Sequence, residues 1–350
     1  MYKFTSQSPL ALSSGKHLKT YEIAYETYGK LNADHSNAIL ICHALSGDAH
    51  ASNPESETEN PGWWQLMVGP EKPIDTNRFF VICTNVLGSC YGSTGPTSLD
   101  PDTHKQYQLS FPVITIEDMV NAQAALIDHL DIQTLFAVVG GSMGGMQTLQ
   151  WSISHPNRLK KAIVIAAAAQ LGPQSLAFNT IGREAIQATP ETPNIGLAIA
   201  RMIGHITYRS DESIGTKFGR KLQEADYGYG FSTEFEIESY LKYQGEKFIN
   251  RFDATTYLYL SKAMSYFDLI KSYGSLESAF KNCTAQFLIM SISSDWLYPS
   301  EQSKEMAKTL IKLNKTVTYC EINSPHGHDS FLMESNDLST MIRSFLDSTS

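Results

Sequence analysis

Leu135-Phe-Ala-Val-Val139 is followed without a break by Gly140-Gly-Ser-Met-Gly-Gly145, and this stretch is the most informative part of the sequence for the fold class. Five consecutive apolar residues are typical of a strand buried on both faces of a parallel sheet. The next residues match the pattern G-x-S-x-G, in which a serine occupies a tight turn between a strand and a helix. The stretch therefore predicts a nucleophile, Ser142, although a plain glycine-rich turn would show the same letters.

Strand and helix patterns alternate on both sides of this turn. Apolar runs predict further strands at 37–42, 79–83, 162–165, 286–290 and 317–322, and residues 20–28 alternate. Thr115-Ile-Glu-Asp118 resembles a capping box at the start of a helix, and further helices are predicted from the serine to about 155 and from about 338. This order predicts an α/β fold with a mostly parallel sheet and helices on both faces.

The residue composition and pattern change near Gly172-Pro173 and stay different to about Cys283. The segment is polar and Tyr-rich, has no short apolar strands, and reads as helical at 197–203 and 234–243. We expect one core domain made of residues 1–171 and 284–350, interrupted by a helical lid over 172–283. Such an insertion is tolerated because doubling the length of a loop costs only about 0.6 kcal/mol of closure free energy.

A serine hydroxyl needs a base, and the base needs an orienting acid. In this kind of fold the acid and then the histidine follow the serine, each on a loop after a later strand. Asp295 follows the strand at 286–290, and His328 follows the strand at 317–322. We assign Asp295 as the orienter and His328 as the general base. His326 remains the alternative base, because it lies two residues away.

Acyl transfer also needs backbone donors for the tetrahedral oxyanion. The N–H of Met143, directly after the nucleophile, is one expected donor. The second is expected from the loop after the strand at 37–42, where His43-Ala-Leu-Ser-Gly47 follows, and Leu45 N–H is the candidate. Leu45 could equally be an ordinary apolar loop residue.

The overall charge excludes several classes of partner. The 350 residues carry 27 Lys and Arg against 36 Asp and Glu, a net charge of −9, with no long basic run. Binding to nucleic acid or to an anionic membrane is therefore not expected, and no apolar stretch approaches the ~20 residues of a membrane span. Met1-Tyr-Lys-Phe-Thr-Ser-Gln-Ser-Pro9 lacks a signal-peptide pattern, so a cytoplasmic location is predicted.

The five cysteines are odd in number, widely spaced and without a CxxC pair. Neither a disulfide framework nor a zinc site is indicated. No cluster of metal-ligating residues is found in the sequence, so no metal and no cofactor is predicted.

Together the motifs resemble the homoserine O-acetyltransferase family, acyltransferases of methionine biosynthesis with the α/β-hydrolase fold. The stretches that carry this resemblance span almost the whole chain: His43-Ala-Leu-Ser-Gly-Asp-Ala-His50, Asn85-Val-Leu-Gly88, Gly92-Ser-Thr-Gly-Pro96, Gly140-Gly-Ser-Met-Gly-Gly-Met-Gln147, Arg201-Met-Ile-Gly-His-Ile-Thr-Tyr-Arg209, Ser294-Asp-Trp-Leu297 and Gly327-His-Asp-Ser-Phe-Leu332.

The resemblance implies a ping-pong mechanism in which Ser142 takes an acetyl group from acetyl-CoA, a co-substrate, and passes it to the hydroxyl of L-homoserine. It favours Arg209 as the residue that grips the acceptor's carboxylate and Asp329 as the partner of its ammonium group. Without it, Arg209 would read as a solvated lid residue and Asp329 as a helix cap. It also implies a homodimer joined through the lids.

Three alternatives stay open at this stage. Succinyl-CoA-dependent homoserine or serine acyltransferases resemble this family, but they often carry an arginine two residues after the orienting aspartate. Here that residue is Leu297, which favours acetyl as the acyl group. A serine esterase would use the same triad with water as acceptor, and a non-catalytic binding protein could retain the scaffold.

Overall fold

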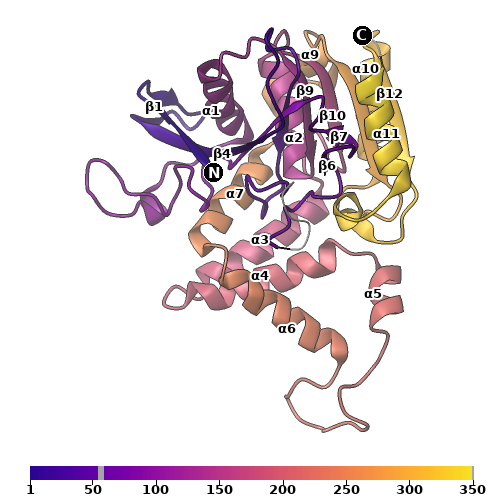
Figure 1. The fold of residues 1–350 in the computed structure, drawn as a ribbon. Coiled ribbons are helices and arrows are strands. Elements are labelled where there is room, and N and C mark those ends of the chain that lie inside the picture. Colours follow the sequence, from indigo (N-terminus) through magenta and orange to yellow (C-terminus); the bar gives the residue numbers. More distant parts are fainter. Residues whose placement is uncertain (54–58, 349–350) are drawn as a thin grey trace.

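A computed structural model describes residues 1–53 and 59–348. An eight-stranded sheet in the order β1-β4-β8-β5-β9-β10-β11-β12 forms its centre (Figure 1). These strands are β1 (Tyr2–Ser6), β4 (Tyr21–Tyr28), β5 (Ala38–Cys42), β8 (Phe80–Thr84), β9 (Leu135–Gly141), β10 (Leu159–Ile165), β11 (Gln286–Ile292) and β12 (Val317–Ile322). Strand β4 runs antiparallel to β1 and β8, and the pairs from β8 to β12 are parallel. The prediction of a mostly parallel sheet is confirmed.

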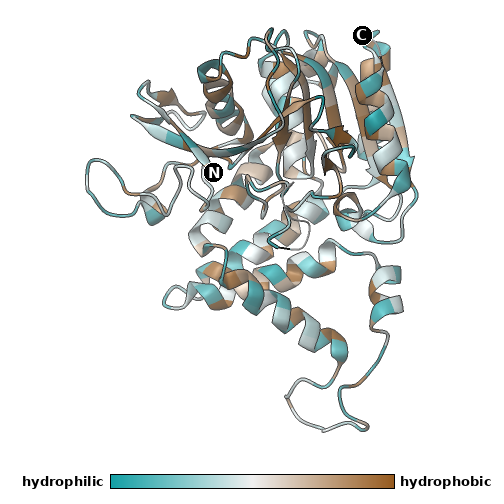
Figure 2. Cartoon of the chain, in the orientation of Figure 1, coloured by the Kyte–Doolittle hydropathy of each residue, from teal (hydrophilic) through white to brown (hydrophobic). Residues whose placement is uncertain are grey.

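The apolar runs form strands because both faces of the sheet are covered. All five residues of β5 are buried, and its side chains alternate between two apolar clusters. Leu40 belongs to the cluster on one face, and Ile39 and Ile41 belong to the cluster on the other. Figure 2 shows that hydrophobic residues are concentrated along the strands of this sheet.

Helices cover the two faces of this sheet. Helices α1 (Ile116–His129), α2 (Met143–Ser154), α9 (Leu276–Phe280) and α10 (Ser300–Lys312) contribute to one apolar cluster, and α11 (Asn336–Asp347) contributes to the other. The capping box predicted at Thr115 is confirmed, because its side chain accepts from Asp118 N–H while the Asp118 carboxylate accepts from Thr115 N–H. Two further strand pairs are short: β2 (Leu10–Ala11) with β3 (His17–Leu18), and β6 (Val68–Gly69) with β7 (Ile74–Asp75).

The segment expected to form the lid is helical in the structure. It contains α3 (Pro173–Gln187), α4 (Pro193–Thr207), α5 (Asp211–Lys217), α6 (Glu236–Ile249), α7 (Ala254–Tyr266) and α8 (Leu269–Tyr273), followed by α9. Helix α4 packs against α3, α6 and α7, and this layer lies beyond one end of the sheet (Figure 1). By contrast, α9 packs against α2 and α10 beside the sheet. The 3₁₀ turns are η1 (Gln108–Ser110) and η2 (Gly327–Leu332).

No helix in residues 1–53 and 59–348 is long and apolar enough to cross a membrane.

Candidate active site

Ser142 occupies the turn between β9 and α2. Its backbone has φ 58° and ψ −124°, a conformation that a residue with a side chain adopts only under strain. The glycines around it are sterically required: a Cβ on Gly140 would lie 2.3 Å from the backbone of Gly144, and a Cβ on Gly144 would lie 2.0 Å from the carbonyl oxygen of Cys42. The turn leaves Ser142 at the N-terminus of α2, where a developing negative charge is stabilised.

Asp295 and His328, far apart in the chain, meet beside this serine. Asp295 follows β11 and His328 lies in η2 after β12; Asp295 Oδ2 is 2.7 Å from His328 Nδ1, and both side chains are buried. The other carboxylate oxygen of Asp295 accepts the backbone N–H groups of Leu297 and Tyr298, both at 2.9 Å. These bonds fix the carboxylate so that it holds the imidazole in one orientation.

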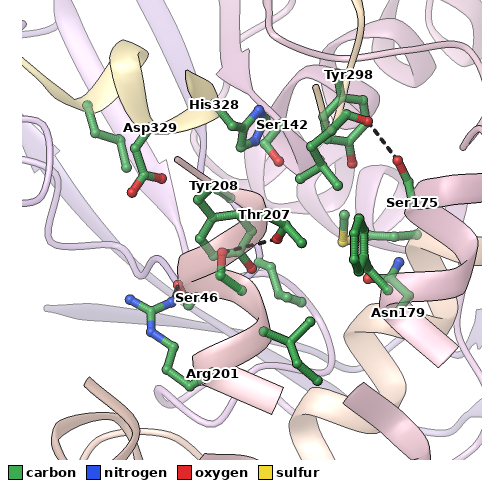
Figure 3. Close-up of a pocket in the computed structure, with 18 of the residues that line it drawn as sticks. Ser46, Ser142, Ser175, Asn179, Arg201, Thr207, Tyr208, Tyr298, His328 and Asp329 are labelled. Atoms are coloured by element: carbon green, nitrogen blue, oxygen red, sulfur yellow. Dashed lines mark hydrogen bonds between the residues drawn. The ribbon is translucent and has the colours of Figure 1, made fainter. Parts of the chain in front are cut away.

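The structure brings His328, and not His326, to the aspartate. Within the described residues the Nδ1 atom of His326 is buried without a hydrogen-bond partner. Ser142 and His328 both line a cavity of about 120 Å³ between the sheet and the lid, and Figure 3 shows both among the residues of its wall.

The electrostatic surroundings of His328 suit a general base. Burial lowers the pKa of His328, but the negative charge of Asp295, the hydrogen bond to it and the charge of Asp329 raise it, and the net pKa lies above the ordinary 6.5. A base of this kind can accept the serine proton near neutral pH.

Tyr298 is a site residue that the sequence reasoning missed. Its ring stacks on the His328 ring, with centroids 5.0 Å apart and planes at 29°, and it lines the same cavity. Burial raises the pKa of its hydroxyl, Asp295 raises it further, and a hydrogen bond with the Ser142 side chain lowers it, leaving the net pKa above its ordinary value. The hydroxyl therefore stays protonated. The sequence signal for Tyr298 was its position three residues after Asp295, in the loop that carries the orienting aspartate.

The loop after β5 lies against the start of α2, as an oxyanion site requires. Gln147 of α2 donates from Nε2 to the carbonyl oxygens of His43 and Met143, both at 3.2 Å, and so ties the two segments together. Leu45 lines the cavity. In the part of the chain that the structure describes, neither the Leu45 N–H nor the Met143 N–H donates a hydrogen bond, so both are free to bind an oxyanion.

The two residues expected to bind the acceptor differ in their placement. Asp329 lines the cavity; burial raises its pKa, while His328, Arg201 and Arg209 lower it, and the net pKa is above its ordinary value. The cavity is lined by Arg201 of α4 and not by Arg209. The Arg209 side chain contacts Ser213 Oγ at 3.5 Å, beyond the end of α4. Both arginines nevertheless have a buried Nε without a hydrogen-bond partner in the described residues, and both lower the pKa of Asp329. Figure 3 shows Arg201 on the cavity wall with Asp329.

The rest of the cavity wall is mostly apolar or neutral. It includes Leu297, as well as Ala44, Phe178, Met264, Phe331 and Leu332. Arg201 is the only cationic side chain other than His328 among the described lining residues. No group of three or more His, Cys, Asp or Glu that could hold a metal is found in residues 1–53 and 59–348. The site can thus form an acyl-serine and hold a small zwitterion beside it.

Comparisons with known proteins agree with this chemistry. The family model described as "alpha/beta hydrolase fold" matches residues 37–334. Homoserine O-acetyltransferase of Methanobrevibacter ruminantium is 53% identical over 355 residues, covering 98% of this chain and 72% of the relative. The protein of the same name from Methanohalobium evestigatum is 54% identical over 351 residues, covering 97% of this chain and 72% of the relative.

Two solved structures are also similar. The crystal structure of homoserine O-acetyltransferase from Bacillus anthracis has a TM-score of 0.92 and 30% identity, covering 99% of this chain and 97% of that one. The crystal structure of esterase E22 has a TM-score of 0.90 and 30% identity, covering 99% of this chain and 100% of that one. An acyltransferase and an esterase thus share this architecture, so the fold alone does not identify the acceptor.

Proposed function

The chain belongs to the homoserine O-acetyltransferase family of α/β-hydrolase-fold acyltransferases, and from that premise we propose which residues carry out the transfer. The observation that carries the assignment is the cavity in which Ser142, His328, Arg201 and Asp329 meet. The reaction moves the acetyl group of acetyl-CoA to the hydroxyl of L-homoserine, with acetyl-CoA as a co-substrate and no metal or prosthetic group.

The first half-reaction acylates the serine. His328, oriented by Asp295, takes the proton of Ser142 as its oxygen attacks the thioester carbon. The carbonyl oxygen becomes an oxyanion bound by the backbone N–H groups of Leu45 and Met143, and the C–S bond breaks as the tetrahedral intermediate collapses. The sulfur leaves as the thiol of CoA after taking the proton from His328.

The second half-reaction deacylates the serine. His328 takes a proton from the homoserine hydroxyl, whose oxygen attacks the acetyl-serine carbonyl. The new tetrahedral intermediate uses the same two backbone donors, and its collapse returns the proton to Ser142. O-Acetylhomoserine leaves, and the triad is restored.

Homoserine must compete with water, which is present at about 55 M, so positioning decides the outcome. Arg201 provides a planar guanidinium that suits the substrate's carboxylate, and Asp329 provides a charge for its ammonium group. With both ends held, the acceptor hydroxyl is placed near the acyl carbon, while the lid helices limit the entry of water.

Leu297 supports acetyl as the acyl group. The carboxylate of a succinyl group would need a cation, and Leu297 presents only an apolar side chain to the cavity. Arg201 is already assigned to homoserine.

The decisive experiment is release of CoA, followed with a thiol reagent, in the presence of homoserine, serine or water as acceptor. We expect homoserine-dependent release from acetyl-CoA to exceed both other rates. Hydrolysis that equals or exceeds transfer to homoserine would favour the esterase function instead, and faster release from succinyl-CoA would overturn the choice of acyl group.

We also propose that two copies join through the lid. Ile195, Ile199 and Ile206 of α4 are 41–55% exposed and follow helical spacing, and Tyr243 of α6 is 57% exposed. An apolar helix face of this kind is typical of an interface. Light scattering should give twice the chain mass, and Ile199→Asp should reduce it; a wild-type monomer would refute the dimer.

A cytoplasmic location is part of the same proposal, because the thioester it consumes is made and kept inside cells. Fractionation of cells that carry the natural protein tests it.

A further inference from the structure

Two arginines share one aromatic ring beside the oxyanion loop. Arg201 of α4 and Arg251, in the turn between α6 and α7, place their guanidinium carbons 4.6 and 5.0 Å from the centroid of the Phe248 ring. Both also contact Ser46, the residue after Leu45: Arg201 Nη1 lies 3.4 Å from its Oγ, and Arg251 Nη1 lies 2.9 Å from its carbonyl oxygen.

Neither arginine has a carboxylate partner. No Asp or Glu oxygen lies within 4.0 Å of either guanidinium in the described parts of the chain. Two carboxylates lie close in the sequence to Ser46 and Arg251, and each accepts a backbone hydrogen bond. Asp48 Oδ1 accepts His50 N–H at 2.9 Å, and Asp253 Oδ1 accepts Thr256 N–H at 2.7 Å. Arg201 is repelled by Arg251 and attracted by Asp329 inside the cavity, and an anionic ligand at Arg251 would relieve the repulsion between the two arginines.

The two cations differ in their access. Arg201 lines the cavity, where the proposed function gives it the carboxylate of the small acceptor. Arg251 is exposed and does not line the cavity. It is nevertheless held in place, because its Nη1 also donates to the Tyr91 hydroxyl at 3.1 Å.

The Arg251 guanidinium still has unused hydrogen-bonding capacity. A guanidinium has five N–H donors, and the bonds to Ser46 and Tyr91 both use Nη1. Within the described residues no bond occupies its Nη2 or Nε. A fixed, unpaired and exposed guanidinium is suited to bind a phosphate, because little side-chain freedom is lost on binding.

We propose that Arg251 is a phosphate-binding residue at the rim, which takes a phosphate group of the CoA thioester while the acetyl end reaches Ser142. This proposal rests on the proposed function and names a subsite for its donor. The flexible pantetheine arm connects a buried thioester to phosphates outside the cavity. The protein has a net charge of −9 and repels a polyanion at long range, so a local cation at the entrance has a clear electrostatic role.

The test compares two acetyl donors that differ only beyond the pantetheine arm. Acetyl-CoA carries the phosphates, and acetylpantetheine lacks them. Transfer to homoserine is measured with each donor for the wild type, Arg251→Gln and Arg251→Lys. Lys308→Gln, which removes an exposed positive charge from α10, is the matched control.

We expect Arg251→Gln to raise KM for acetyl-CoA roughly tenfold or more, as loss of a charged hydrogen bond does, and to leave kcat/KM for acetylpantetheine within about twofold. Arg251→Lys should restore part of the loss, and Lys308→Gln should change neither donor. The wild-type preference for acetyl-CoA should also weaken as salt is added.

Two results would overturn the proposal. An equal loss with both donors would show that Arg251 acts through the Ser46 loop, and no loss with acetyl-CoA would show that it binds no phosphate. A wild-type protein that transfers acetyl from neither donor to homoserine would refute the proposed function itself, before any variant is compared.

Discussion

Replacing Arg201 by glutamine tests which arginine holds the acceptor. Both arginines have a buried Nε without a hydrogen-bond partner in the described residues, but Arg201 lines the cavity with Asp329 and Arg209 does not. In the complex the substrate's carboxylate would satisfy Arg201. The glutamine variant would leave that carboxylate in a buried site without a counter-charge.

The expected loss of activity in Arg201→Gln follows from the burial of this site. Loss of one partner of a buried, hydrogen-bonded charge pair costs about 2–5 kcal/mol, which is roughly 30-fold to several thousandfold in kcat/KM for homoserine. Arg209→Gln is the comparison variant. Arg209 does not line the cavity and acts on Asp329 only through its charge, so its loss should stay within roughly fivefold.

The assay separates acceptor binding from acylation. CoA release is followed as homoserine is varied, and acylation of Ser142 is followed as the burst of p-nitrophenol from p-nitrophenyl acetate. Because the burst needs no homoserine, Arg201→Gln should leave its amplitude and rate near the wild-type values.

A larger loss for Arg209→Gln than for Arg201→Gln would refute the assignment drawn from the cavity. A burst that disappears in Arg201→Gln would show instead that Arg201 supports the fold through its packing on Phe248.

Three further outcomes are expected. Activity toward p-nitrophenyl acetate should fall as pH drops through the raised pKa of His328, because the protonated imidazole cannot act as a base. Asp329→Asn removes a charge that raises this pKa, so the midpoint of the pH profile should move to lower pH. An unchanged midpoint would contradict this reasoning. Gly144→Ala places a Cβ 2.0 Å from the Cys42 carbonyl oxygen and should lower the free energy of unfolding by about 1–3 kcal/mol, checked by urea denaturation; wild-type stability would count against the steric reasoning. Tyr298→Phe keeps the stacked ring but removes the hydroxyl that forms a hydrogen bond with Ser142. Acylation should therefore slow several-fold, with KM for homoserine unchanged. An unaltered burst rate would argue against a role for that hydrogen bond.

Local signals in the sequence determined the core of this protein. Apolar runs marked the central strands, because both faces of the sheet are covered, and the capping box at Thr115 marked the start of α1. The edge strand β1 and the helix α10 were not predicted. Only alternate residues of β1 are buried, so this strand lacks an apolar run. Helix α10 begins directly after the loop that carries Asp295.

The sequence also determined which residue types make up the triad, and their order along the chain. The turn at Ser142 is a local steric requirement that the glycines record. The positions of Asp295 and His328 follow from the rule that functional loops extend from the same ends of parallel strands.

Residues that are close neighbours in the chain could be told apart only from their three-dimensional packing. His328 and His326 differ by two residues, and the direction of η2 brings only one imidazole to Asp295. Arg201 and Arg209 both lie in the stretch 201–209, but α4 ends at Thr207, and only the packing of that helix shows that Arg201 and not Arg209 lines the cavity. A side chain's direction at the end of an element depends on what that element packs against, and those contacts come from residues distant in the sequence.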